Sequence, residues 1–220
     1  LDMDWGPEGV IFTVELADFL ANSQKIFGHN YKDDALKPMR EIFKHAKTVH
    51  FFRLNSTGAK ATNKFATAKY PGTRGNDLKI IIESNENSTT ETPLYDVSTY
   101  LDTVQVDLQK GVSKMGDLVP NDYVDWGTTE TLELTASTPL TGGTNGEVQD
   151  AAYQTYLDQA EAYTFNAMGC PSTSPTITAL FAAHAKRMRD EVGKKFQVVC
   201  FRVLADHEGV ISVKNTIKNK

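Results

Sequence analysis

Residues 175–204 of this 220-residue chain read PTITALFAAHAKRMRDEVGKKFQVVCFRVL, a helical pattern followed by a strand pattern. Apolar residues recur every three or four positions in the first half, which predicts one face of a helix. Ser174 and Pro175 are typical of a helix start, and Gly193 is typical of a helix end. The apolar run at residues 196–204 then predicts a strand in the centre of a sheet. The predicted helical face consists of Ile177, Leu180, Phe181, His184 and Met188.

The rest of the last third repeats this alternation of helix and strand. Residues 165–170 predict a buried strand, and residues 210–213 predict a strand beside the central one. Together these patterns predict an α/β domain over residues 137–220. The helical face that precedes the first of these strands consists of Tyr153, Tyr156, Leu157, Ala160 and Thr164.

Residues 1–56 predict another α/β segment. A first helix ends at Gly28, and Asp33 or Asp34 caps a second helix. The β-forming run at residues 49–54 follows as a strand. We expect this segment to pack with the last domain or to form a small domain. The two helical faces consist of Leu16, Phe19, Leu20, Ser23, Ile26 and Phe27, and of Ala35, Met39, Ile42, Phe43 and Ala46.

The middle of the chain is rich in short strand patterns. Residues 79–83 predict one strand, and alternating apolar positions within residues 95–106 predict more. Residues 110–112 predict a turn into a further strand, and residues 132–134 alternate again. These signals predict a small β-sandwich or barrel over residues 57–136. The fold class is therefore α+β and multidomain, with the sandwich flanked by α/β segments.

Composition excludes several classes of protein. The formal net charge is −5, so the basic surface typical of nucleic-acid binding is missing, and no apolar run is long enough for membrane insertion. Cys170 and Cys200 both lie in apolar stretches, which favours buried free thiols in a reducing compartment over a disulfide. The chain opens with Leu1, and we expect it to be cut from a longer protein.

Two short segments carry residue types that could support chemistry. Residues 141–146 are rich in glycine and precede a predicted helix, but they lack the lysine and the spacing of a P-loop. Asp206, His207 and Glu208 could hold a metal or serve acid–base chemistry. Because adjacent residues of an extended segment point to opposite faces, these three cannot converge on one ion. We predict a flexible inter-element turn in the first case and a turn with surface charges in the second.

The last long helix carries two further candidates. His184 lies among apolar residues, so a core or interface histidine is expected. Residues 186–191 place three cations and two anions near the end of that helix, where cations complement the helix dipole. They predict a solvated or subunit-facing ionic surface. The sequence therefore predicts no catalytic, cofactor-binding or metal-binding residues.

Five stretches carry a family resemblance when they are taken in order. They read KYPGTRGNDL at 69–78, PLTGGTNG at 139–146, YTFN at 163–166, KRMRDEVGKKFQ at 186–197 and DHEGVISVKN at 206–215. They resemble the tail sheath proteins of contractile-tailed phages and phage-tail-like bacteriocins, in the form found in Gram-positive bacteria. Their order and their reach across most of the chain make the match fairly specific.

The resemblance implies a structural subunit and no enzyme. Such a subunit polymerises helically with copies of itself around a tail tube protein and contracts to drive the tube through a cell envelope. It has a β-sandwich domain before an α/β domain that is similar to subtilisin in fold but lacks catalytic residues. Baseplate and tail terminator proteins are implied partners. The implied location is a virion or an extracellular phage-tail-like particle, assembled in the bacterial cytoplasm.

Sheath proteins also have an N-terminal arm and a C-terminal domain with its own arm, which link neighbours by strand sharing. We expect this chain to lack both, and therefore to be monomeric while the full-length subunit forms tubes. Two other functions remain open. One is a hydrolase that uses residues 206–208. The other is a host-surface or carbohydrate-binding module that uses Tyr95, Tyr100 and Tyr123, although core packing or strand pairing explains these tyrosines more simply.

Overall fold

The chain forms two compact units. The computed structural model describes residues 1–128 and 131–215, and it groups residues 2–148 in one unit and Leu1 with the residues from Gln149 onward in the other. The sequence-based boundaries at residues 56 and 136 stay predictions. In the described part of the chain, no helix is long and apolar enough to cross a membrane.

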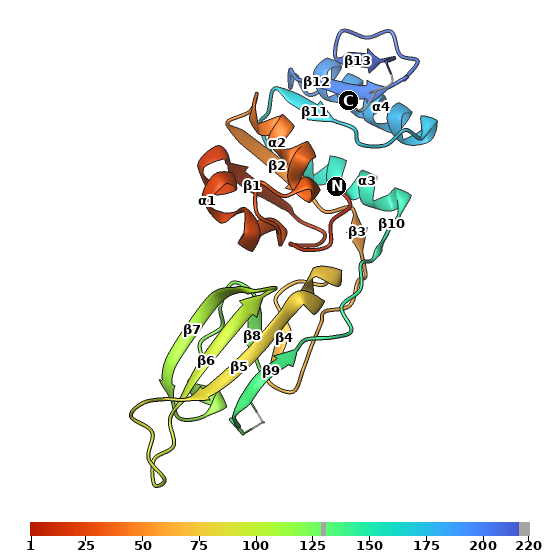
Figure 1. Ribbon diagram of the computed structural model, residues 1–220. Coiled ribbons are helices and arrows are strands. Elements are labelled where there is room, and N and C mark those ends of the chain that lie inside the picture. Colours follow the sequence, from red (N-terminus) through yellow and green to blue (C-terminus); the bar gives the residue numbers. More distant parts are fainter. Residues whose placement is uncertain (129–130, 216–220) are drawn as a thin grey trace. The chain divides into compact units, whose positions relative to one another are not determined.

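The unit of residues 2–148 begins with a small layer of helices on a hairpin-like sheet. Strand β1 (Ile11–Glu15) pairs antiparallel with β2 (Thr48–Phe52). Between them lie α1 (Leu16–Phe27), the 3₁₀ turn η1 (Asp34–Leu36) and α2 (Lys37–Phe43) (Figure 1). β1 has no counterpart among the predicted elements, because its five residues run directly into α1 without a turn residue.

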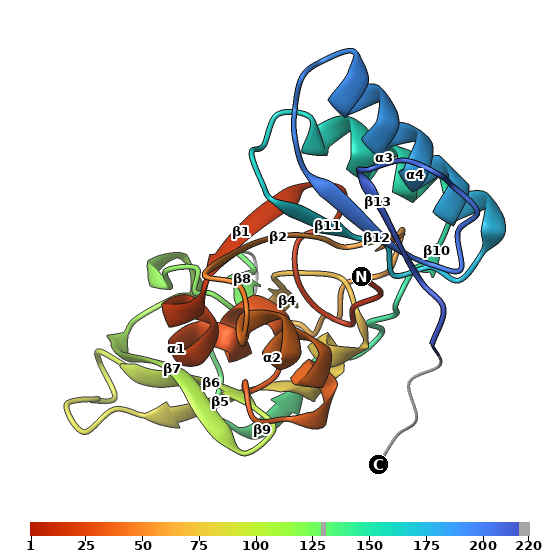
Figure 2. The same cartoon turned by 90° about the horizontal axis from the view of Figure 1, so that it is seen from above.

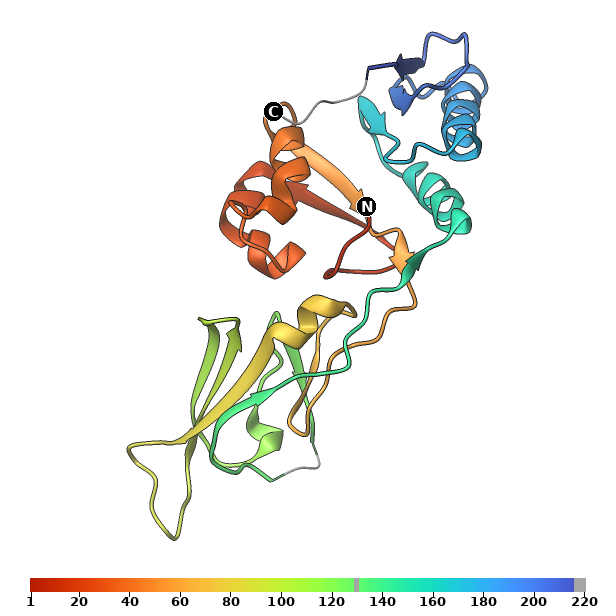
Figure 3. The same cartoon turned by 45° about the vertical axis from the view of Figure 1, so that its right-hand side comes forward.

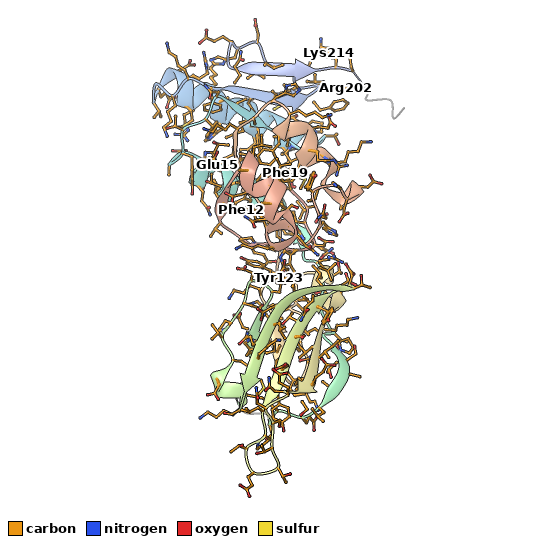
Figure 4. The ribbon with its side chains drawn as sticks, turned by 60° about the vertical axis from the view of Figure 1, so that its left-hand side comes forward. Phe12, Glu15, Phe19, Tyr123, Arg202 and Lys214 are labelled. Atoms are coloured by element: carbon orange, nitrogen blue, oxygen red, sulfur yellow. The ribbon has the colours of Figure 1, made fainter. Side chains whose placement is uncertain are left out.

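Aromatic rings form the core of this layer. The ring centroids of Phe19 and Phe43 lie 4.6 Å apart, and Phe12 of β1 stacks on Phe51 of β2 at 5.8 Å. Figure 4 labels Phe12 and Phe19 on β1 and α1. The prediction of one helix after residue 33 was partly wrong, because a 3₁₀ turn precedes the seven-residue α2. Ile42 of the predicted apolar face is 40% exposed.

The predicted β-sandwich is confirmed. One sheet has the order β7-β6-β5-β9, with antiparallel pairing throughout, and β4 pairs with β8 in a second sheet (Figure 1). Ile80 and Ile82 of β5 point into the core, as the alternation predicts. The bounds are β4 (Ala66–Ala68), β5 (Leu78–Ser84), β6 (Tyr95–Leu101), β7 (Val104–Val112), β8 (Val124–Trp126) and β9 (Thr135–Pro139), with 3₁₀ turns η2 (Thr73–Asp77) and η3 (Met115–Asp117).

Two predictions inside the sandwich were wrong. Residues 110–112 are the end of β7 and no turn, and Gly111, with φ 68°, lies where the register against β6 shifts. Residues 132–134 precede β9 and are not part of a strand. Leu132 is buried but Leu134 is 63% exposed, whereas a strand would place both side chains on one face.

The chain enters and leaves the sandwich through one narrow crossing. β3 (Asn55–Ser56) pairs antiparallel with β10 (Glu147–Val148), and Figure 3 shows the two segments side by side. Residues 57–146, which contain the sandwich, are thus inserted between two paired strands.

The second unit is an α/β layer, as predicted. α3 (Asp150–Ala160) and α4 (Pro175–Asp190) accompany a parallel sheet of order β11-β12-β13, and α4 contacts this sheet (Figure 2). β12 is central, which confirms the prediction from its apolar run. β11 is shorter than the predicted strand at residues 165–170, and Thr164 lies beyond the end of α3. The strand bounds are β11 (Ala167–Gly169), β12 (Gln197–Phe201) and β13 (Val210–Val213).

Candidate functional site

Residues 141–146 connect β9 to β10, and their backbone hydrogen bonds reach Ala59 and Thr62 at the start of the sandwich. We call these residues the glycine clasp. The N–H of Gly143 donates to Oδ1 of Asn76 at 2.8 Å, and Nδ2 of Asn76 donates back to the carbonyl oxygen of Gly143 at 2.9 Å. A Cβ on Gly146 would lie 1.7 Å from the carbonyl oxygen of Ser56, so only glycine fits there. The clasp connects elements as predicted, but it does not open a helix, because β10 lies between it and α3. Its backbone groups therefore join distant segments of this unit.

Residues 206–208 form the predicted turn with surface charges. Nε2 of His207 lies 3.2 Å from Oδ1 of Asp190, and Nδ1 of His207 accepts a hydrogen bond from the N–H of Gly209 at 3.0 Å. Nη2 of Arg189 donates a hydrogen bond to Oε1 of Glu208, and this hydrogen bond lowers the pKa of the Glu208 carboxyl. Among the described residues, no group of three His, Cys, Asp or Glu side chains could hold a metal ion. The hydrogen bonds of His207 orient it toward a carboxylate and a main-chain amide, which is not the arrangement of a nucleophile and its base.

The ionic groups at the end of α4 bind within their own unit. Arg187 pairs with Glu161, and Nη1 of Arg189 donates to the carbonyl oxygen of Phe196 at 2.9 Å. Together with the pair of Asp190 and His207, these contacts tie α4 to the loops on either side of it. The sequence predicted a solvated or subunit-facing surface here. Arg187 and Asp190 are exposed, as a solvated surface requires, whereas the side chain of Arg189 is mostly buried.

His184 is a core histidine, as predicted. It is 7% exposed, and its ring centroid lies 6.2 Å from that of Phe196. Burial lowers the pKa of His184, since a charged imidazolium loses its hydration in the core. The group is therefore held neutral by its surroundings and contributes packing.

A hollow of about 270 Å³ lies in the unit of residues 2–148, and a hydrogen-bonded pair forms part of its lining. Nε2 of His29 lies 2.9 Å from Oδ2 of Asp4. Burial alone would raise the pKa of Asp4, but the hydrogen bond and charge of His29 help to lower it overall. Phe27, Leu36 and Met39 also line the hollow. Its titratable pair is satisfied internally, which favours a structural role.

Sequence reasoning missed a buried junction between the α/β layer and the sandwich. Arg53 is fully buried, and its Nη1 donates to the carbonyl oxygens of Gly6 at 3.1 Å and Pro71 at 2.7 Å. Glu8 lies 3.8 Å from its Nη2. Burial lowers the pKa of Arg53, partly offset by the charge of Glu8. A lone arginine inside the apolar run at residues 51–54 was the available signal.

Arg74 and Trp5 complete this junction. Nε of Arg74 donates to the carbonyl oxygen of Gly28 at 2.7 Å, and its Nη2 lies 2.6 Å from Oδ2 of Asp102. The Trp5 ring packs edge-on against Tyr70, with centroids 5.4 Å apart. Tyr123, labelled in Figure 4, is a second ring neighbour of Trp5. Polar and aromatic groups of this unit thus fix the sandwich to α1.

Two family models match this chain, and both matches begin at the paired strands β3 and β10. Residues 56–145 match the model of the phage tail sheath protein beta-sandwich domain, and residues 146–219 match that of the phage tail sheath protein central domain. The chain belongs to the phage tail sheath protein family. The end of the sheath β-sandwich match coincides with the glycine clasp, so the family boundary lies where the two chain segments pair.

Solved sheath proteins share this fold. The sheath tail protein of Desulfitobacterium hafniense aligns with a TM-score of 0.87 and 41% identity, over 98% of this chain and 51% of that one. A sheath tail protein of Listeria innocua aligns with a TM-score of 0.84 and 33% identity, over 98% of this chain and 49% of that one.

Two proteins of Bacillus subtilis are similar in sequence. The phage-like element PBSX protein XkdK is 34% identical over 95% of this chain and 48% of its own length. The uncharacterised protein YqbK is 36% identical over 86% of this chain and 45% of its own length. This sheath chain therefore spans about half the length of the curated relatives that it matches.

Proposed function

We propose that this chain forms part of a contractile tail sheath subunit. The subunit assembles helically with copies of itself around a tail tube and contracts to drive the tube through a cell envelope. The observation that carries the proposal is the succession of two sheath domains along residues 56–219, with the β-sandwich first. The tail tube protein, baseplate proteins and tail terminator proteins are the proposed partners. The proposed location is a virion or an extracellular phage-tail-like particle, assembled in the bacterial cytoplasm.

The chemistry of the surface supports a structural role without catalytic, cofactor-binding or metal-binding residues. The groups of residues 206–208 that could act in acid–base chemistry make contacts inside the second unit: His207 with Asp190, and Glu208 with Arg189. A scaffold of this kind acts through its surfaces, and its charged groups then maintain the shape of those surfaces.

The two rival functions have no comparable support. A hydrolase would need a nucleophile on His207, whose hydrogen bonds go to Asp190 and Gly209. A carbohydrate-binding module would use exposed aromatic rings, but Tyr123 is buried beside Trp5. The half-buried ring of Tyr100 is also in contact within the sandwich, because Nζ of Lys79 lies 5.6 Å from its centroid.

Immunogold electron microscopy tests the proposal. Antibodies raised against the chain are applied to tail particles released from induced cells that encode it, with antibody pre-absorbed on the chain as control. We expect gold along the whole length of extended and contracted tails. Gold at the tail tip alone would support a host-surface binding module and overturn the proposal. Particles without gold, with the chain free in the lysate, would also overturn it.

A further inference from the structure

Cys170 and Cys200 follow the last paired residues of two neighbouring parallel strands. β11 and β12 pair in register at Gly169 and Val199, and the N–H of Cys170 donates to the carbonyl oxygen of Val199 at 3.0 Å. The next residue on each strand is a cysteine. Neighbouring strands lie about 4.8 Å apart, and disulfides join Cα atoms roughly 4.4–6.8 Å apart. The backbone register therefore permits a bond between these two thiols.

Both thiols belong to the same face of the sheet. Side chains alternate along a strand, so Cys170 shares its face with Met168, and Cys200 shares its face with Val198. Met168, Val198 and Cys200 are all buried, and Sγ of Cys200 donates to the carbonyl oxygen of Thr178 in α4 at 3.8 Å. Paired residues of parallel strands point to one side, which places the two sulfur atoms next to each other under α4.

The two thiols differ in access and acidity. Cys170 is half-buried, whereas Cys200 is buried, so solvent reaches Cys170 first. A hydrogen bond between the thiols lowers the pKa of Cys170. The same hydrogen bond, together with burial, raises the pKa of Cys200. Thiolate is the reactive form, so Cys170 is the more reactive member of the pair.

We propose that Cys170 and Cys200 form a redox-active dithiol that low-molecular-weight disulfides, such as oxidised glutathione, convert to an intrachain disulfide. The Cys170 thiolate attacks one sulfur of oxidised glutathione, and one glutathione leaves as a thiolate and takes up a proton. The Cys200 thiol gives its proton to solvent and attacks the Cys170 sulfur, which displaces the second glutathione. Two protein thiols are oxidised, and one disulfide is reduced to two thiols. The new bond ties β11 to β12 at the start of the loop into α4.

Mass spectrometry and thiol counting test the proposal on the whole chain. The reduced chain is incubated with oxidised glutathione at neutral pH, and its mass and its free thiols are measured after denaturation. We expect loss of both thiols, a mass lower by two hydrogen atoms, and a peptide crosslink between the two cysteines. The melting temperature should rise by several degrees, since a crosslink restricts the unfolded chain. Two retained thiols, disulfide-linked dimers or a stable glutathione adduct on the wild-type chain would each overturn the proposal.

Single substitutions separate the two roles. Cys200→Ser should accumulate one glutathione on Cys170, because no second thiol can displace it. Cys170→Ser should remain unmodified under the same conditions, because Cys200 is buried. Equal modification of both variants would contradict the order of attack. If a variant does not fold, one-to-one binding of phenylarsine oxide to the reduced wild-type chain, which requires two adjacent thiols, decides the question: binding supports the pair, and its absence overturns it.

Discussion

The indole N–H of Trp5 donates a hydrogen bond to the carbonyl oxygen of Lys25 at 3.1 Å, while the Trp5 ring lies in the core of the β-sandwich. Lys25 is in the last turn of α1, and its Nζ pairs with Asp122 of the sandwich at 3.1 Å. The ring of Trp5 is 1% exposed. One side chain from the start of this sheath chain therefore joins α1 to the sandwich inside the unit of residues 2–148.

Loss of the Trp5 ring should destabilise this unit strongly. Trp5→Ala should cost about 3–5 kcal/mol of unfolding free energy, because it empties a buried aromatic site. Trp5→Phe keeps a ring but removes the hydrogen bond to Lys25, worth about 1 kcal/mol, and should cost less than Trp5→Ala. Urea unfolding measures both values. Trp126→Ala is the matched control, since Trp126 is only half-buried. An equal cost at Trp126 would contradict the central place given to Trp5.

The glycine clasp should not tolerate a methyl group at Gly146. Gly146→Ala would place Cβ 1.7 Å from the carbonyl oxygen of Ser56, so the paired segments β3 and β10 must move apart. We expect a loss of at least about 1–3 kcal/mol, as in overpacked sites. Gly116→Ala is the control, because nothing lies within 4 Å of the added Cβ. Urea unfolding of both variants compares them, and similar stabilities would show that the crossing is loosely packed.

The sequence predicted those strands and helices whose apolar residues recur with one clear period. The structure explains why the other elements were missed. The apolar run of β12 predicted a central strand, and β12 does lie between β11 and β13, with Val198 and Cys200 buried on one face and Val199 and Phe201 half-buried on the other. β1 was missed since its period changes from strand to helix between Glu15 and Leu16 with no intervening turn. The stop at Gly28 was predictable, because its positive φ of 76° favours glycine.

The contacts of the junction and of the glycine clasp could not be predicted, because both join residues distant in sequence. Arg53 is buried only because Gly6 and Pro71 supply carbonyl oxygens from other segments. Local patterns contain no record of such partners. Similarly, the charges at residues 186–191 predicted an ionic surface, but nothing in the helix indicated that Glu161 and Glu208 would pair with Arg187 and Arg189.

Acidification should weaken α4 and its sheet through His184. Burial lowers the pKa of His184 below 6.5, so between these two values the unfolded chain binds a proton that the folded chain does not. The contribution of neutral His184 to the free energy of unfolding is therefore complete above pH 6.5, and it is lost as the pH falls toward the lowered pKa. Hydrogen exchange of amides in α4 and β12 at pH 7 and pH 5 measures the change, after correction for intrinsic exchange.

A variant without His184 provides the control for this pH effect. His184→Gln should be less stable at pH 7 but should lose less stability between pH 7 and pH 5 than the wild-type chain. The exposed His45 lies in the other unit, and His45→Gln should leave the pH dependence of α4 unchanged. An unaltered pH dependence in His184→Gln would assign the effect to other groups, such as Glu161 and Asp158, whose charges also act on His184.

Removal of the buried Arg53 charge should destabilise the junction by roughly 3 kcal/mol, because breaking a buried ion pair leaves its partners uncompensated. In Arg53→Met, the carbonyl oxygens of Gly6 and Pro71 lose their donor, and Glu8 loses its counter-charge. Arg53→Lys keeps the charge, but a single ammonium cannot reproduce the planar fork, so it should recover only part of the loss. Lys60→Met, at an exposed position of the same unit, should change stability little.

Urea unfolding of the three variants, repeated with Glu8→Gln in each background, measures the coupling of Arg53 to Glu8. Additive losses would show that Arg53 acts through the two carbonyl groups alone.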